Sequence, residues 1–393
     1  MYMKCLIYGA RSKTKTNHRT WIFDLEKHNV KCVRKEYEMN LFIFIIWNRA
    51  YNMKTKIIED IYNNFIVHKV IEIEWSKELF SRNLSRFYGE NLPPNCNKEL
   101  DIGTQPFTLV VVEDKNPIYE LRKTTRGEIE KVNVHMFDSK KKYRSWTGIN
   151  NSRVHCSNTV EETKHDLTLL LGLNPSDFMK IKDKIKDRIK KDLVGARGWK
   201  SMEQLFYVLN ETCEYVVMRN FEGLPESFFV SGHNDIDLLV DRFDNVLKIC
   251  NGHLVYKNDY RVQVSCKVAK KKVQVDIRYL GDGYYDKGWE ENILKNRIIF
   301  NNLYIPDNDN YKYMLLYHAL VHKKEIKSDY KKRLNELFGT GKWSQKVLDV
   351  YMGDNNYKYC EPRDFSVFYN YKQIGEKASL LRRMQDFYMK VLN

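Results

Sequence analysis

The sequence predicts an α/β (α+β) protein, in which an α/β sandwich is followed by a mixed sheet with a helical C-terminal cap. Between 41 and 121, apolar runs typical of buried strands alternate with stretches of helical spacing, which is the order of an α/β sandwich. A second set of strand-like runs begins after Gly195 and Gly198. Beyond 306 the apolar residues recur at helical spacing, which predicts the cap.

The strands and helices of the sandwich can be predicted one by one from the first part of the chain. The run from Leu41 to Trp47 is apolar throughout, as in a strand buried on both faces. The stretch from Lys54 to Phe65 has the apolar spacing of a helix. The strands expected after it are 67–75 and 108–112, with a helix at 76–88 between them and a helix or turn starting at Ile118.

A charged stretch is expected to link the two parts. It runs from 175 to 194 and interleaves Lys with Asp, and its apolar residues recur at helical spacing, which predicts a solvated helix with one apolar stripe. Gly195 and Gly198 mark the boundary. The expected segments are a leader (1–40), the sandwich (41–172), the charged linker helix (173–198), the mixed sheet (199–305) and the helical region (306–393).

The second part reads as strands and helices in alternation. A hairpin through Lys270 and Lys271 is expected to join strands at 260–269 and 272–279. The other expected strands are 215–218, 236–240 and 298–305, and the expected helices are 201–212, 243–250, 287–295, 310–323 and 378–391. His318 and His322 share a face of the helix at 310–323, where packing or substrate contact is favoured over metal binding because no H-E-x-x-H acid lies between them.

The composition is that of a globular protein with anionic partners. The chain has 393 residues, of which 43% are hydrophobic and 30% charged, and its formal net charge is +15. A positive field favours nucleotides, nucleic acid or a phosphorylated polymer. The cysteines form no C-x-x-C or C-x-H pattern, which argues against a zinc site and against a disulfide framework.

No membrane segment is expected. A helix needs roughly 18 or more apolar residues to cross a bilayer, and the run from Leu41 to Trp47 is too short. The N-terminus also lacks the apolar core of a signal peptide. We therefore expect a cytoplasmic protein. Lys, Asn and Tyr are abundant and Pro is scarce, which we attribute to an AT-rich genome such as a viral one; the location would then be the host cytoplasm.

Three carboxylates form the strongest functional pattern. Asp235 and Asp237 are one residue apart at the start of an apolar run, so on a strand both side chains point to the same side. Asp276 lies in a second strand-like run, Val273 to Arg278. Carboxylates held together need a cation, and hard oxygen ligands suit Mg²⁺ or Mn²⁺. The alternative for an isolated D-x-D pair is a plain turn at a strand edge.

At these residues the chain resembles the polymerase-β-like nucleotidyltransferase superfamily, roughly from Lys200 to Tyr304. The resemblance implies that Asp235, Asp237 and Asp276 bind two metal ions on a nucleoside triphosphate, with Asp276 as a candidate base. The family's phosphate-contacting Gly-Ser pair has no clear counterpart, so Arg219 and Asn220 are the candidates for that role. The reaction implied is nucleotidyl transfer to a hydroxyl or phosphate acceptor.

The segment from Ser152 to Thr163 is similar to the N-x-x-H-G-S-D signature of the nucleoside diphosphate kinase family. The similarity runs from about 41 to 172 and implies a kinase-like sandwich in which His155 accepts phosphate and Asp166 orients its ring. It also implies phosphate contacts at Tyr88, Arg126 and Arg144. Where the family has a phosphate-binding Lys after its first strand, this chain has Ile46-Trp47-Asn48-Arg49-Ala50.

Three functions therefore compete. The first is metal-dependent nucleotidyl transfer with Mg²⁺ or Mn²⁺ and a nucleoside triphosphate. The second is phosphoryl transfer through a phosphohistidine at His155. The third is a non-catalytic nucleotide-binding protein. The expected partners are a nucleotide and a phosphorylated acceptor or RNA, with no membrane; the oligomeric state stays open.

Overall fold

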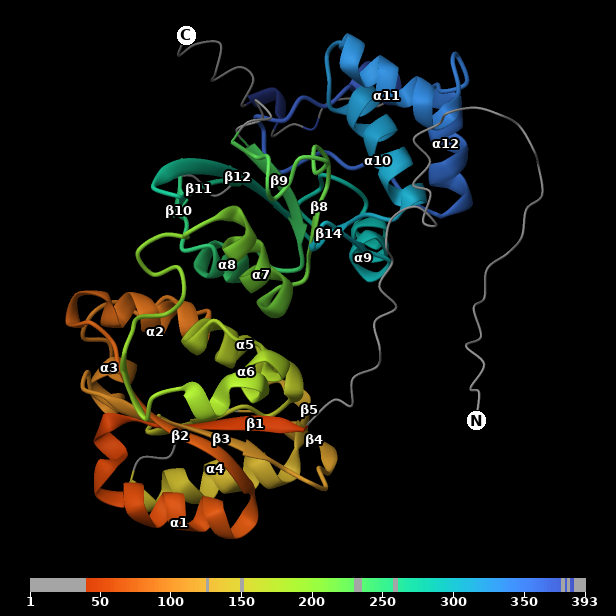
Figure 1. The fold of residues 1–393 in the computed structure, drawn as a ribbon. Coiled ribbons are helices and arrows are strands. Elements are labelled where there is room, and N and C mark those ends of the chain that lie inside the picture. Colours follow the sequence, from red (N-terminus) through yellow and green to blue (C-terminus); the bar gives the residue numbers. More distant parts are fainter. Residues whose placement is uncertain are drawn as a thin grey trace, which may run out of the picture.

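The computed structural model describes residues 40–124, 127–148, 152–229, 235–256, 261–375, 379 and 382–384. Two lobes, each built on one sheet, are stacked (Figure 1). The N-terminal lobe comprises residues 40–194 and the C-terminal lobe residues 199–375. The leader expected at 1–40, apart from Asn40, lies outside the described residues, as do Arg126 and most of the helix expected at 378–391. The α/β class is confirmed.

The N-terminal sheet has the strand order β6-β1-β3-β2-β7. Strand β1 lies inside it, antiparallel to both β3 and β6. All six residues of β1 are buried, which explains why this strand carries no polar side chain. The strands are β1 (Leu41–Ile46), β2 (Ile66–Glu74), β3 (Phe107–Glu113), β6 (Val154–Cys156) and β7 (Arg188–Lys190).

Helices cover both faces of this sheet (Figure 1). Alternation along β1 sends Phe42 and Phe44 to one face and Ile43 and Ile45 to the other, and each pair joins a separate apolar cluster. The first face is covered by α1 (Lys54–Asn64) and α4 (Val134–Trp146), and the second by α2 (Phe80–Tyr88), α5 (Val160–Leu171) and α6 (Pro175–Ile181). The connections include 3-10 turns at Asn48–Met53 and Lys77–Leu79 and the short helix α3 (Asn97–Ile102).

The C-terminal sheet has the strand order β10-β11-β12-β9-β8, and its central pair, β9 and β12, is parallel. The hairpin between β11 and β12 is confirmed; its turn lies at Ala269 and Lys270, which both have positive φ (48° and 67°). The strands are β8 (Tyr215–Val217), β9 (Asp235–Val240), β10 (His253–Leu254), β11 (Gln263–Val268) and β12 (Lys271–Tyr279).

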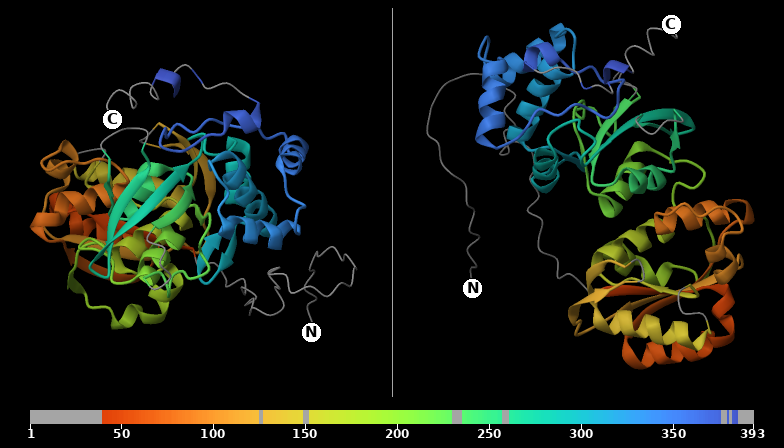
Figure 2. Two further views of the ribbon diagram at one scale, coloured as in Figure 1. Left: turned by 90° about the horizontal axis from the view of Figure 1, so that it is seen from above. Right: turned by 180° about the vertical axis from the view of Figure 1, so that it is seen from behind.

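The two faces of this sheet meet different helices. Ile236, Leu238 and Val275 join the core shared with α7 (Met202–Thr212) and α8 (Phe243–Ile249). Leu239 faces the other way, into a second cluster with the C-terminal helices. These are α9 (Lys287–Lys295), α10 (Asn308–Val321), α11 (Ser328–Phe338), α12 (Gln345–Asp354) and α13 (Tyr371–Ile374), with the hairpin β13 (Ile298–Phe300) and β14 (Leu303–Ile305) between α9 and α10. Figure 2 shows α10 to α12 at one side of this lobe.

Two expected elements need correction. The helix expected at 175–194 ends at Ile181, and after a 3-10 turn at Lys182–Lys184 the chain forms β7, which pairs with the edge of β2. An open strand edge offers backbone hydrogen bonds that outweigh the helical spacing of Ile185 and Ile189. The region after Ile118 is a hairpin of β4 (Tyr119–Lys123) and β5 (Ile129–Asn133) rather than a helix or turn.

The lobes share one apolar core. The cluster that contains Leu167 and Leu170 of α5 also contains Leu205 and Leu209 of α7 and continues to Val275 of β12. The expected boundary at Gly195 and Gly198 is a packed turn: a Cβ on Gly195 would lie 2.7 Å from the ring of Trp199. Among the described helices, none combines the length and apolar character needed to cross a bilayer.

Candidate functional site

The structure brings the three carboxylates together at the start of the parallel strand pair. Asp237 on β9 and Asp276 on β12 are direct partners in the register, and Asp235 lies two residues before Asp237 on the same face. Asp235 is exposed, Asp237 is buried and Asp276 is half-buried. These residues, which we call the carboxylate triad, lie on the face that carries the C-terminal helices.

Arg219 holds one oxygen of the triad. Its Nη2 donates to Asp237 Oδ1 at 2.5 Å, and its Nη1 donates to the Tyr284 hydroxyl at 3.3 Å. The chain of contacts continues from the Tyr284 hydroxyl to His318 Nδ1 at 2.9 Å. A buried histidine of α10 is thus connected through a tyrosine and an arginine to the triad. Arg219 was expected to contact phosphates, whereas its partner in the structure is the Asp237 carboxylate.

Asn220 has a structural partner as well. Its backbone has positive φ (57°), and its Oδ1 accepts a hydrogen bond from Arg333 Nη1 at 2.9 Å. Arg333 also donates to Glu222 at 2.8 Å and to the Tyr311 hydroxyl at 2.5 Å. Asn220 therefore anchors α11 to the loop after β8.

Electrostatics oppose full ionisation of the triad. Burial raises the pKa of Asp237, Arg219 opposes the increase, and Asp235 and Asp276 add to it. Burial also raises the pKa of Asp276, an effect that Arg278 opposes and Asp235 reinforces. Asp276 Oδ1 is buried and has no hydrogen-bond partner among the described residues. An orphaned buried carboxylate oxygen beside two further acids is a donor set that suits a hard divalent cation.

Four further residues near the triad make contacts within the protein. Arg278 shares the face of Asp276, but it pairs with Asp364 at 3.2 Å and its guanidinium lies 4.6 Å from the centroid of the Tyr284 ring. Asp282 Oδ1 accepts the backbone N–H of Tyr284 at 2.8 Å, as a turn-forming acid does. His318 and His322 are buried against tyrosine rings, with the His322 and Tyr284 centroids 4.2 Å apart.

His155 occupies a different site, on β6 in the N-terminal lobe. The ring is buried edge-on against Phe87 and Tyr88, with centroids 5.3 and 5.7 Å away. Its Nε2 is hydrogen-bonded to Asp166 Oδ2 at 2.8 Å. The other oxygen of Asp166 bonds to His165 Nδ1 at 3.0 Å. Burial alone would raise the pKa of Asp166, but the two imidazoles lower it below its usual value.

Tyr88 and Arg144 line the same pocket as His155, and their expected phosphate contacts stay predictions. The Tyr88 hydroxyl accepts a hydrogen bond from Trp47 Nε1 at 3.2 Å, and burial raises the pKa of this hydroxyl. Arg144 Nε donates to the Val154 carbonyl at 2.8 Å, and burial lowers the pKa of its guanidinium. Arg126 lies outside the described residues, so its expected phosphate contact stays a prediction.

A pocket of about 1200 Å³ opens onto His155 between the two lobes. One wall belongs to the N-terminal lobe and includes Tyr88, Lys98, Lys140, Arg144, His155, Glu162 and Asp166. The other wall belongs to the C-terminal lobe and includes Thr212, Asp241, Arg242, Phe243, Arg261 and Tyr279. Because Asp241 and Tyr279 lie at the ends of β9 and β12, the pocket and the triad lie at opposite ends of this strand pair.

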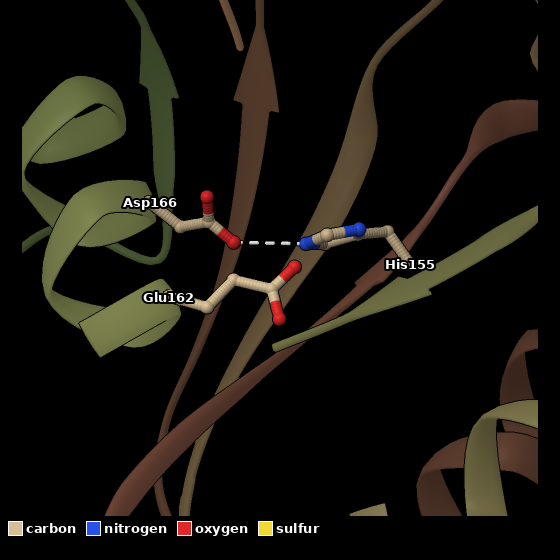
Figure 3. A group of neighbouring side chains, drawn as sticks. All are labelled: His155, Glu162 and Asp166. Atoms are coloured by element: carbon tan, nitrogen blue, oxygen red, sulfur yellow. Dashed lines mark hydrogen bonds and ion pairs between the residues drawn. The ribbon is translucent and has the colours of Figure 1, made fainter. Parts of the chain in front are cut away.

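Glu162, which was not among the residues predicted from the sequence, completes a cluster with His155 and Asp166. One ligand atom of each residue lies within 4.8 Å of the others. Figure 3 shows both carboxylates, which come from α5, near the His155 ring. The signal was present: Glu162 and Asp166 are four apart, so they share a helix face. The wall from the C-terminal lobe had no such signal, because it depends on how the lobes are packed.

Comparison with known proteins adds no family assignment: no protein-family model matches the chain, and neither curated proteins nor solved structures gave a match.

Proposed function

We propose that the chain is a metal-dependent nucleotidyltransferase that transfers a nucleoside monophosphate from a nucleoside triphosphate to a hydroxyl or phosphate acceptor. One observation carries the proposal: Asp237 and Asp276 are register partners on parallel strands, and Asp235 lies on the same face. A plain strand-edge turn at Asp235 and Asp237 would require no third acid opposite them.

The proposed roles follow from exposure and hydrogen bonding. Asp235, Asp237 and Asp276 would hold Mg²⁺ or Mn²⁺, which fits the carboxylate donors and the orphaned Asp276 Oδ1. Bound divalent ions would neutralise charge on the triphosphate and the leaving pyrophosphate and lower the pKa of an acceptor hydroxyl. In this proposal the Asp276 carboxylate would accept the proton of that hydroxyl.

Arg219 has two roles in this proposal. In the arrangement described above, it neutralises Asp237 and so stabilises a buried carboxylate. If Asp237 Oδ1 coordinates a cation, the guanidinium is released from that oxygen and becomes a donor for a phosphate group. The hydroxyl of Tyr284 remains its second contact and limits how far the guanidinium can move.

The direct test follows phosphorus from the α-position of the triphosphate. The full-length chain is incubated with α-labelled nucleoside triphosphates, Mn²⁺ and separate acceptors: RNA, a sugar phosphate, an alcohol phosphate and the chain itself. We expect label on an acceptor together with pyrophosphate release. Both should fall by at least about 1000-fold in Asp235→Asn and Asp237→Asn, since removing one group that stabilises transition-state charge already removes about that much.

The matched control is Asp309→Asn, an exposed acid in the first turn of α10. This variant should retain the activity of the unaltered chain. Nucleotide binding without pyrophosphate release for every acceptor, or release that survives Asp237→Asn, would contradict the proposal.

A second candidate function is phosphoryl transfer through His155. The supporting observation is that Nε2 is held by Asp166, which leaves Nδ1 as the ring nitrogen available for attack on phosphorus. Lys98, Lys140 and Arg144 line the same pocket as His155 and are candidate contacts for a phosphate group there. In this case γ-labelled triphosphate should leave an acid-labile label on the protein that His155→Ala abolishes and Asp237→Asn does not.

A further inference from the structure

We propose that His155, Glu162 and Asp166 form a binding site for one divalent transition-metal ion, Zn²⁺, in the pocket between the lobes. This site is independent of the carboxylate triad and of nucleotidyl transfer. It uses one imidazole nitrogen and two carboxylate oxygens.

The geometry brings three ligand atoms to one point. His155 Nε2 and Asp166 Oδ2 are 2.8 Å apart, and a ligand atom of Glu162 lies within 4.8 Å of both. In Figure 3 the Glu162 carboxylate lies beside the hydrogen bond between the other two residues. Tetrahedral Zn²⁺ bonds of about 2 Å place neighbouring ligand atoms slightly more than 3 Å apart, so a small separation of His155 and Asp166 would admit the ion.

Local structure fixes both carboxylates. Thr159 caps the start of α5 through the backbone N–H of Glu162 at 3.1 Å, and the helix places Asp166 one turn later on the same face. The backbone N–H of Asn158 donates to Glu162 Oε2 at 2.6 Å. His165 Nδ1 bonds to Asp166 Oδ1, the oxygen that does not contact His155. Such partners outside the ligand set hold metal ligands in position.

The donor types select the ion. An imidazole nitrogen with two carboxylate oxygens suits Zn²⁺ better than Mg²⁺, which prefers oxygen ligands alone. Three protein ligands leave a fourth position, and His155, Glu162 and Asp166 all line the interlobe pocket. That position would be available to water or to an anionic group of a molecule in the pocket. The expectation that no zinc site exists rested on cysteine spacing and does not cover this ligand set.

Metal binding and phosphohistidine formation exclude each other at a given moment. An imidazole that coordinates a metal through Nε2 carries its proton on Nδ1 and is no longer a nucleophile there. One equivalent of Zn²⁺ at this cluster should therefore suppress the acid-labile labelling of the protein by γ-labelled triphosphate. This effect distinguishes metal binding by His155 from phosphoryl transfer through it.

The test is a Zn²⁺ titration of the full-length Asp235→Asn/Asp237→Asn double variant, in which the triad is weakened as a competing site. We expect one tight Zn²⁺ equivalent, measured by competition with a fluorescent chelator. Adding Asp166→Asn or Glu162→Gln should lower the affinity more than about 100-fold, because even supporting residues contribute about 10- to 100-fold. His165→Gln should lower it by about 10-fold.

Co²⁺ provides an independent probe. Its visible absorption should be that of a nitrogen and oxygen site without the near-ultraviolet thiolate band, which would indicate binding to cysteine instead. Far-ultraviolet circular dichroism identifies any variant that fails to fold. Because Glu162 is only half-buried, Glu162→Gln should fold even if Asp166→Asn does not. Unchanged affinity in folded Glu162→Gln and Asp166→Asn, or no Zn²⁺ binding by the double variant, would overturn the proposal.

Discussion

At the scale of single residues, the carboxylates of the triad differ in whether a positively charged group neutralises them. Asp237 is paired with Arg219, whereas Asp276 Oδ1 is buried with no hydrogen-bond partner among the described residues. Removing the charge of Asp276 relieves repulsion, but removing the charge of Asp237 leaves a largely buried guanidinium unpaired. Two isosteric substitutions should therefore have opposite effects on the stability of the metal-free chain.

Asp276→Asn should raise the melting temperature of the metal-free chain by about 2 °C, a shift typical of small stability gains in proteins of this size. The reason is that the buried Asp276 Oδ1 has no hydrogen-bond partner among the described residues, so that replacing the carboxylate by an amide removes an unfavourable buried charge and leaves no cation unpaired. Calorimetry in a chelator measures the effect. Mn²⁺ should then stabilise the unaltered chain more than the variant, and equal stabilisation of both would count against metal binding here.

Asp237→Asn should destabilise the metal-free chain by roughly 3 kcal/mol, the usual effect of breaking a buried ion pair from one side. Urea unfolding measures it. The double substitution Asp237→Asn with Arg219→Met should recover much of the loss, because no unpaired charge remains. If Arg219→Met does not restore stability, the unpaired guanidinium is not the cause of the loss.

Strand alternation was enough to predict that Asp235 and Asp237 share a face, and the structure places Asp276 beside them. The partner of Asp237 could not be predicted, because Arg219 comes from a different loop and reaches the triad only after folding. The same holds for Asn220, whose partner Arg333 is far away in the sequence.

At the scale of elements, α2 connects the two lobes through Arg86. Its guanidinium donates to the carbonyls of Lys248 and Ile249 at the end of α8, and to that of Val194 in the connecting turn. Burial lowers the pKa of Arg86 to about 10. A buried cation of the N-terminal lobe thus donates hydrogen bonds to backbone carbonyls at the end of a helix in the C-terminal lobe.

Arg86→Met should therefore destabilise the chain by roughly 2 to 4 kcal/mol, since buried carbonyls lose their donor. Arg82→Met is the matched control on the same helix, because Arg82 is less buried and contacts Asn251 and His253 near the surface. It should change stability by less than about 0.5 kcal/mol. Equal losses in the two variants, measured by urea unfolding, would contradict a connecting role specific to Arg86.

On helix α9, Glu290 is expected to make the stability of the chain depend on pH. Glu290 is buried, accepts the backbone N–H groups of Gly281 and Tyr285, and has a pKa that burial raises to about 8. A raised carboxyl pKa favours the folded state below the unfolded value, and this stabilisation is lost as pH rises through about 8. Glu290→Gln should thus match the unaltered chain near pH 5 and be more stable at pH 9. Parallel stability curves from pH 5 to 9 would show that Glu290 is ionised throughout.

Most elements followed from local patterns. The buried run of β1, the helix α9 and the β11–β12 hairpin lie where apolar spacing and turn residues placed them. The pattern was misleading at β7, where pairing with β2 replaces the second half of the expected helix. A strand of so few residues depends on its neighbour, which a local window does not contain.

At the scale of the whole molecule, the two lobes share one hydrophobic core. Apolar side chains of α5 and α7 belong to the same cluster, and Lys164 on α5 pairs with Glu211 on α7 at 2.9 Å. Two parts with a boundary near Gly195 were expected from the sequence, but how closely they pack depends on contacts between residues far apart in the chain. The pocket at His155 exists only because they do.

The full-length chain should therefore unfold in a single calorimetric transition, and residues 1–198 produced alone should aggregate because their half of the shared core is exposed. Scanning calorimetry and size-exclusion chromatography measure the two outcomes. Two separated transitions, together with a soluble, folded 1–198 fragment, would show that the lobes are independent domains.

Anomalous diffraction from crystals soaked with Mn²⁺ and a non-hydrolysable nucleoside triphosphate tests the central claim most directly. We expect Mn²⁺ peaks bonded to Asp235, Asp237 and Asp276, with the Arg219 guanidinium moved from Asp237 to a phosphate oxygen. A nucleotide bound elsewhere, with Arg219 still paired to Asp237 and no peak at the triad, would contradict it.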